Sequence, residues 1–199
     1  MNHQRHRQCR GTTPVRKGYG PTSFWLQDPK AVFDHLALQE GTVFVDAGCG
    51  AGEYSLFAAG LLGEKGRVIA LDTVKTSIEQ LNVLALEEGK TNVTGHVCDI
   101  TAPLPLETGS VDVLMLSTVL HIKSVRDQAE SMFSEFRRAL RPDGMLAVLE
   151  CKKEEANFGP PLHSRLSAED VEALAAPCGF EKHSELLLEH TYLACFQPR

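Results

Sequence analysis

The chain has 199 residues, of which 43% are hydrophobic and 23% are charged, and its formal net charge is −6. This length suits one domain with a full core, and the acidic balance argues against a nucleic-acid partner, which usually needs a basic face. No apolar run approaches the roughly 20 residues of a membrane span. The N-terminus lacks the apolar core of a signal peptide. We therefore expect a cytoplasmic protein without membrane association.

The six cysteines form no CxxC pair. This spacing argues against a zinc site or a thioredoxin-like motif, and we expect reduced, mostly buried thiols and no metal. For the assembly, we expect a monomer or a homodimer.

The first 20 residues contain five basic side chains and no acidic one, and they show no apolar periodicity. We predict a flexible arm over residues 1–27 that could order as a lid over a substrate. Three aromatic side chains, Tyr19, Phe24 and Trp25, lie at its end. Such residues are usually core, but here they could close over a ligand and contact the substrate.

From Asp28 onward the pattern predicts one α/β domain over residues 28–199. Asp28 and Pro29 provide an N-cap and a first-turn proline for a helix. The expected strands are 43–46, 67–72, 93–99, 111–117, 145–150, 180–188 and 191–196, with a turn at 142–144. The expected later helices are 53–61, 75–88, 124–140 and one that begins after Ser167 and ends near Gly179. Near-continuous apolar strands that alternate with helices indicate a parallel sheet covered on both faces, closed by an antiparallel hairpin.

The first strand runs into a glycine-rich turn that contains Gly48, Gly50 and Gly52. Such a turn allows positive φ angles and places a helix N-terminus over a ligand. The strand ends at Asp46, however, and a carboxylate there would repel a pyrophosphate. The turn therefore disfavours a dinucleotide and would suit a ligand with an ammonium group.

Two further carboxylates, Asp72 and Asp99, end the next two strands. In a parallel sheet these acids share the carboxyl edge, where such folds bind ligands. A carboxylate on the second strand can accept both ribose hydroxyls, and one on the third can accept an exocyclic amine. The implied ligand has an amino group, a ribose and an adenine but no phosphate, and S-adenosylmethionine (SAM) has these parts.

These motifs resemble the class I SAM-dependent methyltransferases, in the small-molecule branch that contains the ubiquinone and menaquinone C-methyltransferases. The resemblance rests on residues 43–52 (VFVDAGCGAG), 66–72 (GRVIALD), 98–100 (CDI), 104–106 (LPL), 110–115 (SVDVLM), 119–122 (VLHI) and 136–144 (FRRALRPDG). It implies a Rossmann-like, doubly wound seven-stranded sheet in the order 3-2-1-4-5-7-6 with strand 7 antiparallel.

The resemblance also implies cofactor-binding residues. They are Asp46, Gly48, Gly50, Gly52 and Ser117 for the methionine moiety, Asp72 and Thr73 for the ribose and adenosine, and Asp99 and Ile100 for the adenine.

Methyl transfer mainly needs an acceptor in line with the methyl carbon, and it needs a base only when the acceptor must lose a proton. His121, just past the fourth strand, is the best candidate base, although a packing role is the alternative. Glu150 and Lys152 follow the fifth strand and could contact the substrate, or they could simply be solvated. Arsenite methyltransferases share this branch and use spaced cysteines, but here only Cys151 is expected near the substrate.

The predicted function is methyl transfer from SAM to a small molecule. One alternative is a SAM-binding regulatory or partner protein that has lost transfer. Another is an RNA methyltransferase that uses the basic arm. Tight cofactor binding without turnover would favour the first alternative, and salt-sensitive RNA binding that disappears on deletion of residues 1–20 would favour the second.

Overall fold

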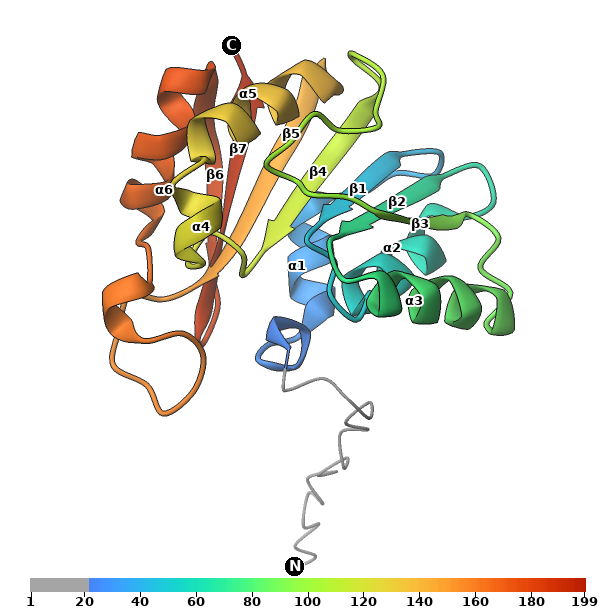
Figure 1. Ribbon diagram of the computed structural model, residues 1–199, viewed down its shortest axis with the longest axis horizontal. Coiled ribbons are helices and arrows are strands. Elements are labelled where there is room, and N and C mark those ends of the chain that lie inside the picture. Colours follow the sequence, from blue (N-terminus) through green and yellow to red (C-terminus); the bar gives the residue numbers. More distant parts are fainter. Residues whose placement is uncertain (1–21) are drawn as a thin grey trace, which may run out of the picture.

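A seven-stranded sheet forms the centre of the computed structural model, which describes residues 22–199 (Figure 1). Its strands in chain order are β1 (Val43–Ala47), β2 (Arg67–Asp72), β3 (Val93–Val97), β4 (Val111–Ser117), β5 (Leu140–Cys151), β6 (Phe180–Leu187) and β7 (Thr191–Pro198). They lie in the order β3-β2-β1-β4-β5-β7-β6, and β7 runs antiparallel to both of its neighbours. This confirms the strand order and the antiparallel strand that the resemblance implied.

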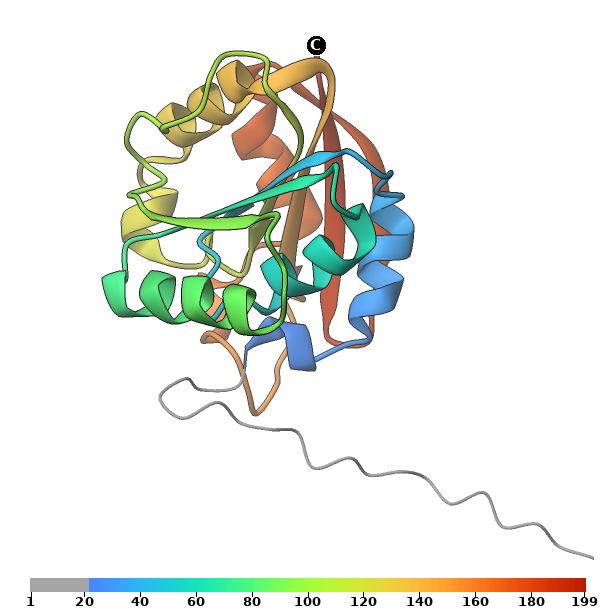
Figure 2. The same cartoon turned by 90° about the vertical axis from the view of Figure 1, so that its right-hand side faces the viewer.

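Helices cover both faces of the sheet (Figures 1 and 2). In chain order they are η1 (Ser23–Trp25), α1 (Pro29–Leu36), α2 (Glu53–Leu62), α3 (Lys75–Glu87), α4 (Lys123–Arg126), α5 (Ala129–Ala139), η2 (Leu162–Ser164), α6 (Ala168–Ala175) and η3 (Ala176–Cys178). The apolar faces of α1, α2 and α3 pack on one side of the sheet, and those of α5 and α6 pack on the other. No helix within residues 22–199 is long and apolar enough to cross a membrane.

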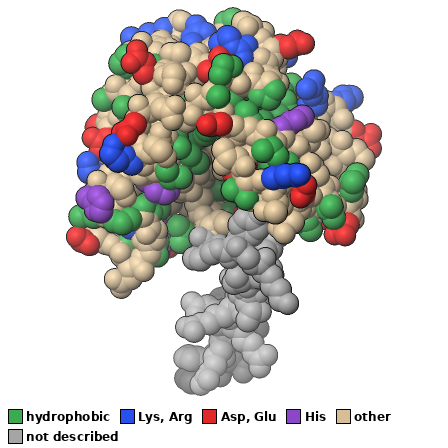
Figure 3. All heavy atoms as spheres, in the orientation of Figure 1, with side chains coloured by type: hydrophobic (Ala, Val, Ile, Leu, Met, Phe, Trp, Pro, Cys, Tyr) green, Lys and Arg blue, Asp and Glu red, His purple; other side chains and the backbone are tan. Residues whose placement is uncertain are grey.

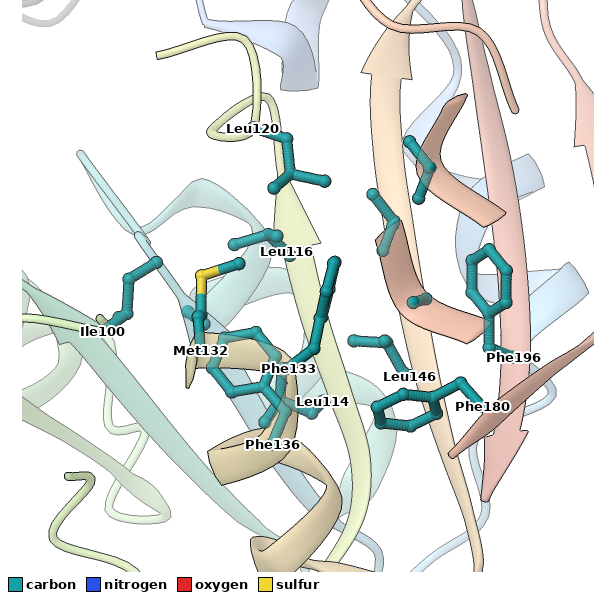
Figure 4. Packing of buried hydrophobic residues seen from close by; sticks show 14 of the residues in the cluster. Ile100, Leu114, Leu116, Leu120, Met132, Phe133, Phe136, Leu146, Phe180 and Phe196 are labelled. Carbon is teal, nitrogen blue, oxygen red and sulfur yellow. The ribbon is translucent and has the colours of Figure 1, made fainter. Parts of the chain in front are cut away.

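The inner strands β1, β2 and β4 are buried on both faces, because alternate side chains point to opposite sides of the sheet and helices cover both sides. In β4, Leu114 and Leu116 join the core under α5, whereas Val113 and Met115 join the core under α1 to α3. Figure 4 shows Leu114 and Leu116 beside the α5 side chains Met132, Phe133 and Phe136. Full burial of a side chain of this size contributes roughly 2–3 kcal/mol, so this double packing holds the strands in fixed register.

The structure corrects three predicted elements. The helix expected over 124–140 is two helices, because Gln128 leaves helical geometry (φ −112°, ψ 16°) between α4 and α5. The turn expected at 142–144 is a bulge within β5, where the pairing shifts from Val111–Leu140 to Val113–Met145. The third strand ends at Val97 rather than at residue 99. All three differences lie at element ends or interruptions, where apolar spacing alone gives a weak signal.

Candidate functional site

A cavity of about 690 Å³ opens at the carboxyl edge of the parallel strands. Its walls come from the segments that follow β1, β2, β3, β4 and β5, together with η1 and the stretch just before it. Figure 3 shows the surface hollowed at this edge, with acidic and basic side chains interspersed over the same face. The cavity therefore lies where a doubly wound sheet binds its ligand.

The three turn glycines have positive φ angles but different surroundings. A Cβ on Gly48 would lie 2.7 Å from Val119, and one on Gly52 would lie 2.5 Å from Leu81. At Gly50 (φ +52°) an added Cβ would meet no atom within 4 Å. Gly48 and Gly50 line the cavity, whereas Gly52 caps α2 and packs against α3. The bare backbone at Gly50 is thus the part of the turn that is open to a ligand.

Asp46 is 1% exposed and accepts a 2.6 Å hydrogen bond from the Ser55 hydroxyl of α2. Burial raises the pKa of this carboxyl to about 7, and the nearby charge of Asp72 adds to the shift. Asp46 is not one of the described residues that line the cavity. The Asp46 carboxylate therefore joins β1 to α2 through Ser55, and its predicted contact with the methionine moiety stays a prediction.

Asp72 lies on the cavity wall at the end of β2. Its Oδ2 accepts the Gly50 N–H at 2.9 Å, and its Oδ1 accepts the Val74 N–H at 2.8 Å. These two bonds fix the carboxylate plane and connect it to the glycine turn. Because each carboxylate oxygen can accept a second hydrogen bond, the oriented Asp72 can receive two adjacent hydroxyl groups, with Thr73 beside it on the same wall.

Asp99 and Ile100 line the neighbouring part of the cavity, beyond the end of β3. The Asp99 Oδ1 accepts both the N–H (2.9 Å) and the hydroxyl (2.7 Å) of Thr101, and these bonds lower the pKa of the carboxyl. The second oxygen of the Asp99 carboxylate, Oδ2, can accept a hydrogen bond from a ligand amine. Ile100 is 5% exposed and contributes an apolar surface next to this acceptor, which is a suitable combination for a planar heterocycle.

The η1 segment contributes a hydroxyl cluster that the sequence did not reveal. Ser23 Oγ lies 2.9 Å from the Oγ of Ser117, and the Thr118 hydroxyl lies 3.3 Å from Ser23. All three residues line the cavity, as do Thr22 and Leu26. Only Ser117 was predicted here, because no sequence pattern connects a serine before the first helix to the end of β4.

The aromatic residues predicted for the substrate are placed differently. Phe24 is buried in an aromatic cluster with Tyr54, at a ring-centroid distance of 5.1 Å. Trp25 is 47% exposed, and its Nε1 donates to Glu53 at 3.2 Å. Neither Phe24 nor Trp25 is among the described residues that line the cavity. Tyr19 lies in residues 1–21 of the predicted arm, which are outside the described part of the chain.

His121 lines the far end of the cavity, with 24% of its side chain exposed. Its Nδ1 lies 3.5 Å from Oε2 of Glu150, which is 1% exposed and accepts the Leu120 N–H at 2.8 Å. Glu150 is thus a buried partner of the His121 loop and not an open substrate contact. Lys152, also predicted for the substrate, does not line the cavity within the described residues.

The loop after β5 is organised by Arg165, a buried cation (4% exposed). Its guanidinium donates to the backbone carbonyls of Lys152, Glu154, Phe158 and Pro160, at 2.6–3.0 Å. Gly159 and Pro160 of this loop line the cavity. The sequence predicted a loop here but gave no signal that one arginine fixes its backbone.

The sheet order, the open glycine turn and the two carboxylates at the ends of β2 and β3 define the class as the SAM-dependent methyltransferases. A family of methyltransferase domains matches residues 38–188, and the chain therefore belongs to this methyltransferase domain family. The chain is also similar, at 24% identity and a TM-score of 0.80, to the crystal structure of a SAM-dependent methyltransferase from Aquifex aeolicus, covering 87% of this chain and 91% of that one.

Two named relatives are enzymes. An arsenite methyltransferase from Aquipseudomonas alcaligenes is 29% identical over 161 residues, which cover 72% of this chain and 45% of that protein. A demethylmenaquinone methyltransferase from Lactococcus lactis is 29% identical over 110 residues, which cover 55% of this chain and 42% of that protein. The chain thus spans less than half the length of these relatives.

Proposed function

We propose that this chain binds SAM at the cavity and transfers its methyl group to a small-molecule acceptor. The observation that supports this most is Asp72, whose two oxygens are both oriented by backbone N–H groups on the cavity wall. The ribose would lie on Asp72, the adenine between Asp99 and Ile100, and the amino-acid end along the Gly50 backbone toward Ser117. The donor and acceptor groups on these walls match the hydroxyls, the amine and the ring of the cofactor.

Bound SAM supplies an electrophilic methyl carbon. The contribution of the chain is to hold the acceptor in line with that carbon and to exclude water from it. The far end of the cavity suits this task because its walls include Val119, Ile122 and Val125, and because the loop at Gly159 and Pro160 is fixed by Arg165. An enclosure of this size accommodates a small organic molecule, which supports a small-molecule acceptor.

Cys49, Cys98 and Cys151 all line the cavity, which makes arsenite a relevant comparison acceptor given the relative of that name. Burial raises the pKa of each of these thiols. Within residues 22–199, no three His, Cys, Asp or Glu side chains are grouped so that they could hold a metal ion. Organic acceptors are therefore the better match to this cavity.

Calorimetry with the full chain tests the cofactor part of the proposal. SAM and S-adenosylhomocysteine (SAH) should both bind, whereas NAD should not. A folded chain that binds neither SAM nor SAH would refute the proposal. Release of SAH with a panel of phenols, thiols, amines and arsenite then tests transfer, and tight SAM binding without release from any of them would favour a non-transferring cofactor-binding protein.

A further inference from the structure

The ionisable side chains that line the cavity separate into two groups along the sheet edge. Asp72 and Asp99 follow β2 and β3, and Glu53 accepts the Trp25 indole N–H. Neighbouring strands are about 4.8 Å apart, so the end of β5 lies about 14 Å from that of β2. At the β4 and β5 end, the described ionisable residues on the wall are His121 and Cys151.

Cys151 is a poor proton acceptor in this position. Its side chain is 2% exposed, and burial together with the charge of Glu150 raises the pKa of the thiol, although Arg165 partly offsets this. The thiol therefore stays protonated near neutral pH and contributes a weakly polar wall. This leaves His121 as the described group that can take up a proton at the acceptor end of the cavity.

The two nitrogens of His121 are in different environments. Nδ1 is buried, makes no hydrogen bond with any described group, and has the Glu150 carboxylate as its nearest charged partner at 3.5 Å. An ionised carboxylate can only accept, so a lone pair on Nδ1 would face it unfavourably. The favoured tautomer therefore has its proton on Nδ1 and its lone pair on Nε2, and the exposed quarter of the side chain belongs to atoms other than Nδ1.

One backbone hydrogen bond holds Glu150, and its neighbouring polar side chains bond to other groups. Its Oε1 accepts the Leu120 N–H, which joins the carboxylate to the residue just before His121. Tyr192 pairs with it across β5 and β7, but the Tyr192 hydroxyl donates to the Leu166 carbonyl instead. Arg165, the nearby buried cation, donates to backbone carbonyls. The Glu150 Oε2 therefore faces His121 as its ionic partner.

We infer that Glu150 is a positioning residue that orients His121 to accept a proton, and that the methyl acceptor is a neutral hydroxyl compound with an apolar body, with a phenol as its simplest representative. This inference rests on the proposed function. The apolar walls at Ile122 and Val125 match the body of such a molecule, and the Nε2 of His121 matches its hydroxyl.

The step balances without a further reagent. The acceptor hydroxyl gives its proton to His121 Nε2 while its oxygen forms a bond to the methyl carbon. The carbon–sulfur bond breaks, and its electron pair stays on the sulfur of SAH. The positive charge that the sulfonium loses appears on the imidazolium, where the buried Glu150 stabilises it. Release of the proton to solvent restores the neutral histidine.

Nitrogen-15 NMR of histidine-labelled full chain tests the tautomer directly. The signals that disappear in His121→Asn identify the residue. In the wild type they should report a proton on Nδ1, and in Glu150→Gln that preference should be lost. His163→Asn and Glu155→Gln, both exposed, are the matched controls. A wild-type proton on Nε2, or a tautomer that Glu150→Gln leaves unchanged, would overturn the inference.

Turnover provides the second readout. With neutral phenols at pH 7, His121→Asn should lower kcat at least 100-fold and Glu150→Gln at least tenfold, with KM and SAH affinity within threefold of wild type. With nitrophenol at pH 9, which is already ionised, the His121→Asn loss should be below tenfold. Equal losses for both acceptors, or methylation of arsenite or a thiol but of no phenol, would overturn the inference. A wild type that does not bind SAH would instead refute the proposed function.

Discussion

Replacement of Asp72 by alanine should weaken SAH binding by about 3 kcal/mol. The side chain can accept two ribose hydroxyls, and each hydrogen bond to a charged group contributes about 1.5–3 kcal/mol. We use the lower value because Asp72 is only half-buried, and two such bonds correspond to a roughly 150-fold rise in Kd. Calorimetry with SAH measures this directly. Asp72→Asn keeps one acceptor oxygen and should show a loss of about tenfold.

Asp28→Ala is the matched control for this substitution. Asp28 also accepts a backbone N–H, that of Lys30 at 2.9 Å, but as the N-cap of α1 and away from the cavity. Its loss should lower the free energy of unfolding by about 1 kcal/mol and leave the Kd for SAH unchanged. The ribose assignment would be refuted if Asp72→Ala bound SAH within threefold of wild type, or if both variants lost the same affinity.

Three further substitutions test the scaffold around the cavity. Gly52→Ala should lower the free energy of unfolding in urea by about 2–3 kcal/mol, because strain at positive φ adds to an overlap with α3. Gly50→Ala should lower the same free energy by only about 1 kcal/mol, yet it should weaken SAH binding. Equal losses of stability in the two variants would contradict the packing role of Gly52. Burial raises the pKa of Asp46 in the folded chain to about 7, so between about pH 4 and pH 7 the folded state holds a proton that the unfolded state has released. Wild-type stability should therefore fall as pH rises through that window, by up to about 1.4 kcal/mol per pH unit relative to Asp46→Asn, and a constant difference between the two proteins would contradict this. Arg165→Met removes the donor to four backbone carbonyls, so it should lower the free energy of unfolding by about 3 kcal/mol and make residues 152–160 sensitive to limited proteolysis. An unchanged cleavage pattern would show that the loop keeps its conformation without Arg165.

Most of the sheet could be predicted because the inner parallel strands β1, β2 and β4 bury both faces and so read as apolar runs. The run at 111–117 was predicted with the observed bounds of β4 for this reason. The break before α5 could not be predicted, because Val125, Ala129 and Met132 keep helical spacing across it. The spacing records which residues face the core, but the angles of Gln128, which interrupt the helix, leave no trace in that pattern.

The adenosine end of the site was readable because it depends on strand ends. A carboxylate that closes a parallel strand must lie at the ligand edge, and Asp72 and Asp99 both line the cavity. Asp46 shows the limit of this reasoning. It lies opposite Ala70 of β2, two residues before the level of Asp72, and the Ser55 hydroxyl of α2 donates a hydrogen bond to its buried carboxylate. Position along a strand could be predicted from the sequence, but burial by a later helix could not.

The acceptor end of the cavity depends on contacts between segments far apart in the chain, so it was the part of the site that the sequence predicted least well. His121 was predicted from its place after β4, and Glu150 from its place after β5, as two separate candidates. They pair because β4 and β5 are adjacent and because Glu150 is buried. Its carboxylate therefore faces the Nδ1 of the imidazole instead of solvent. A buried carboxylate that faces one histidine stabilises the protonated, positively charged form of that histidine. The chemistry of this end therefore belongs to the pair, and neither residue alone defines it.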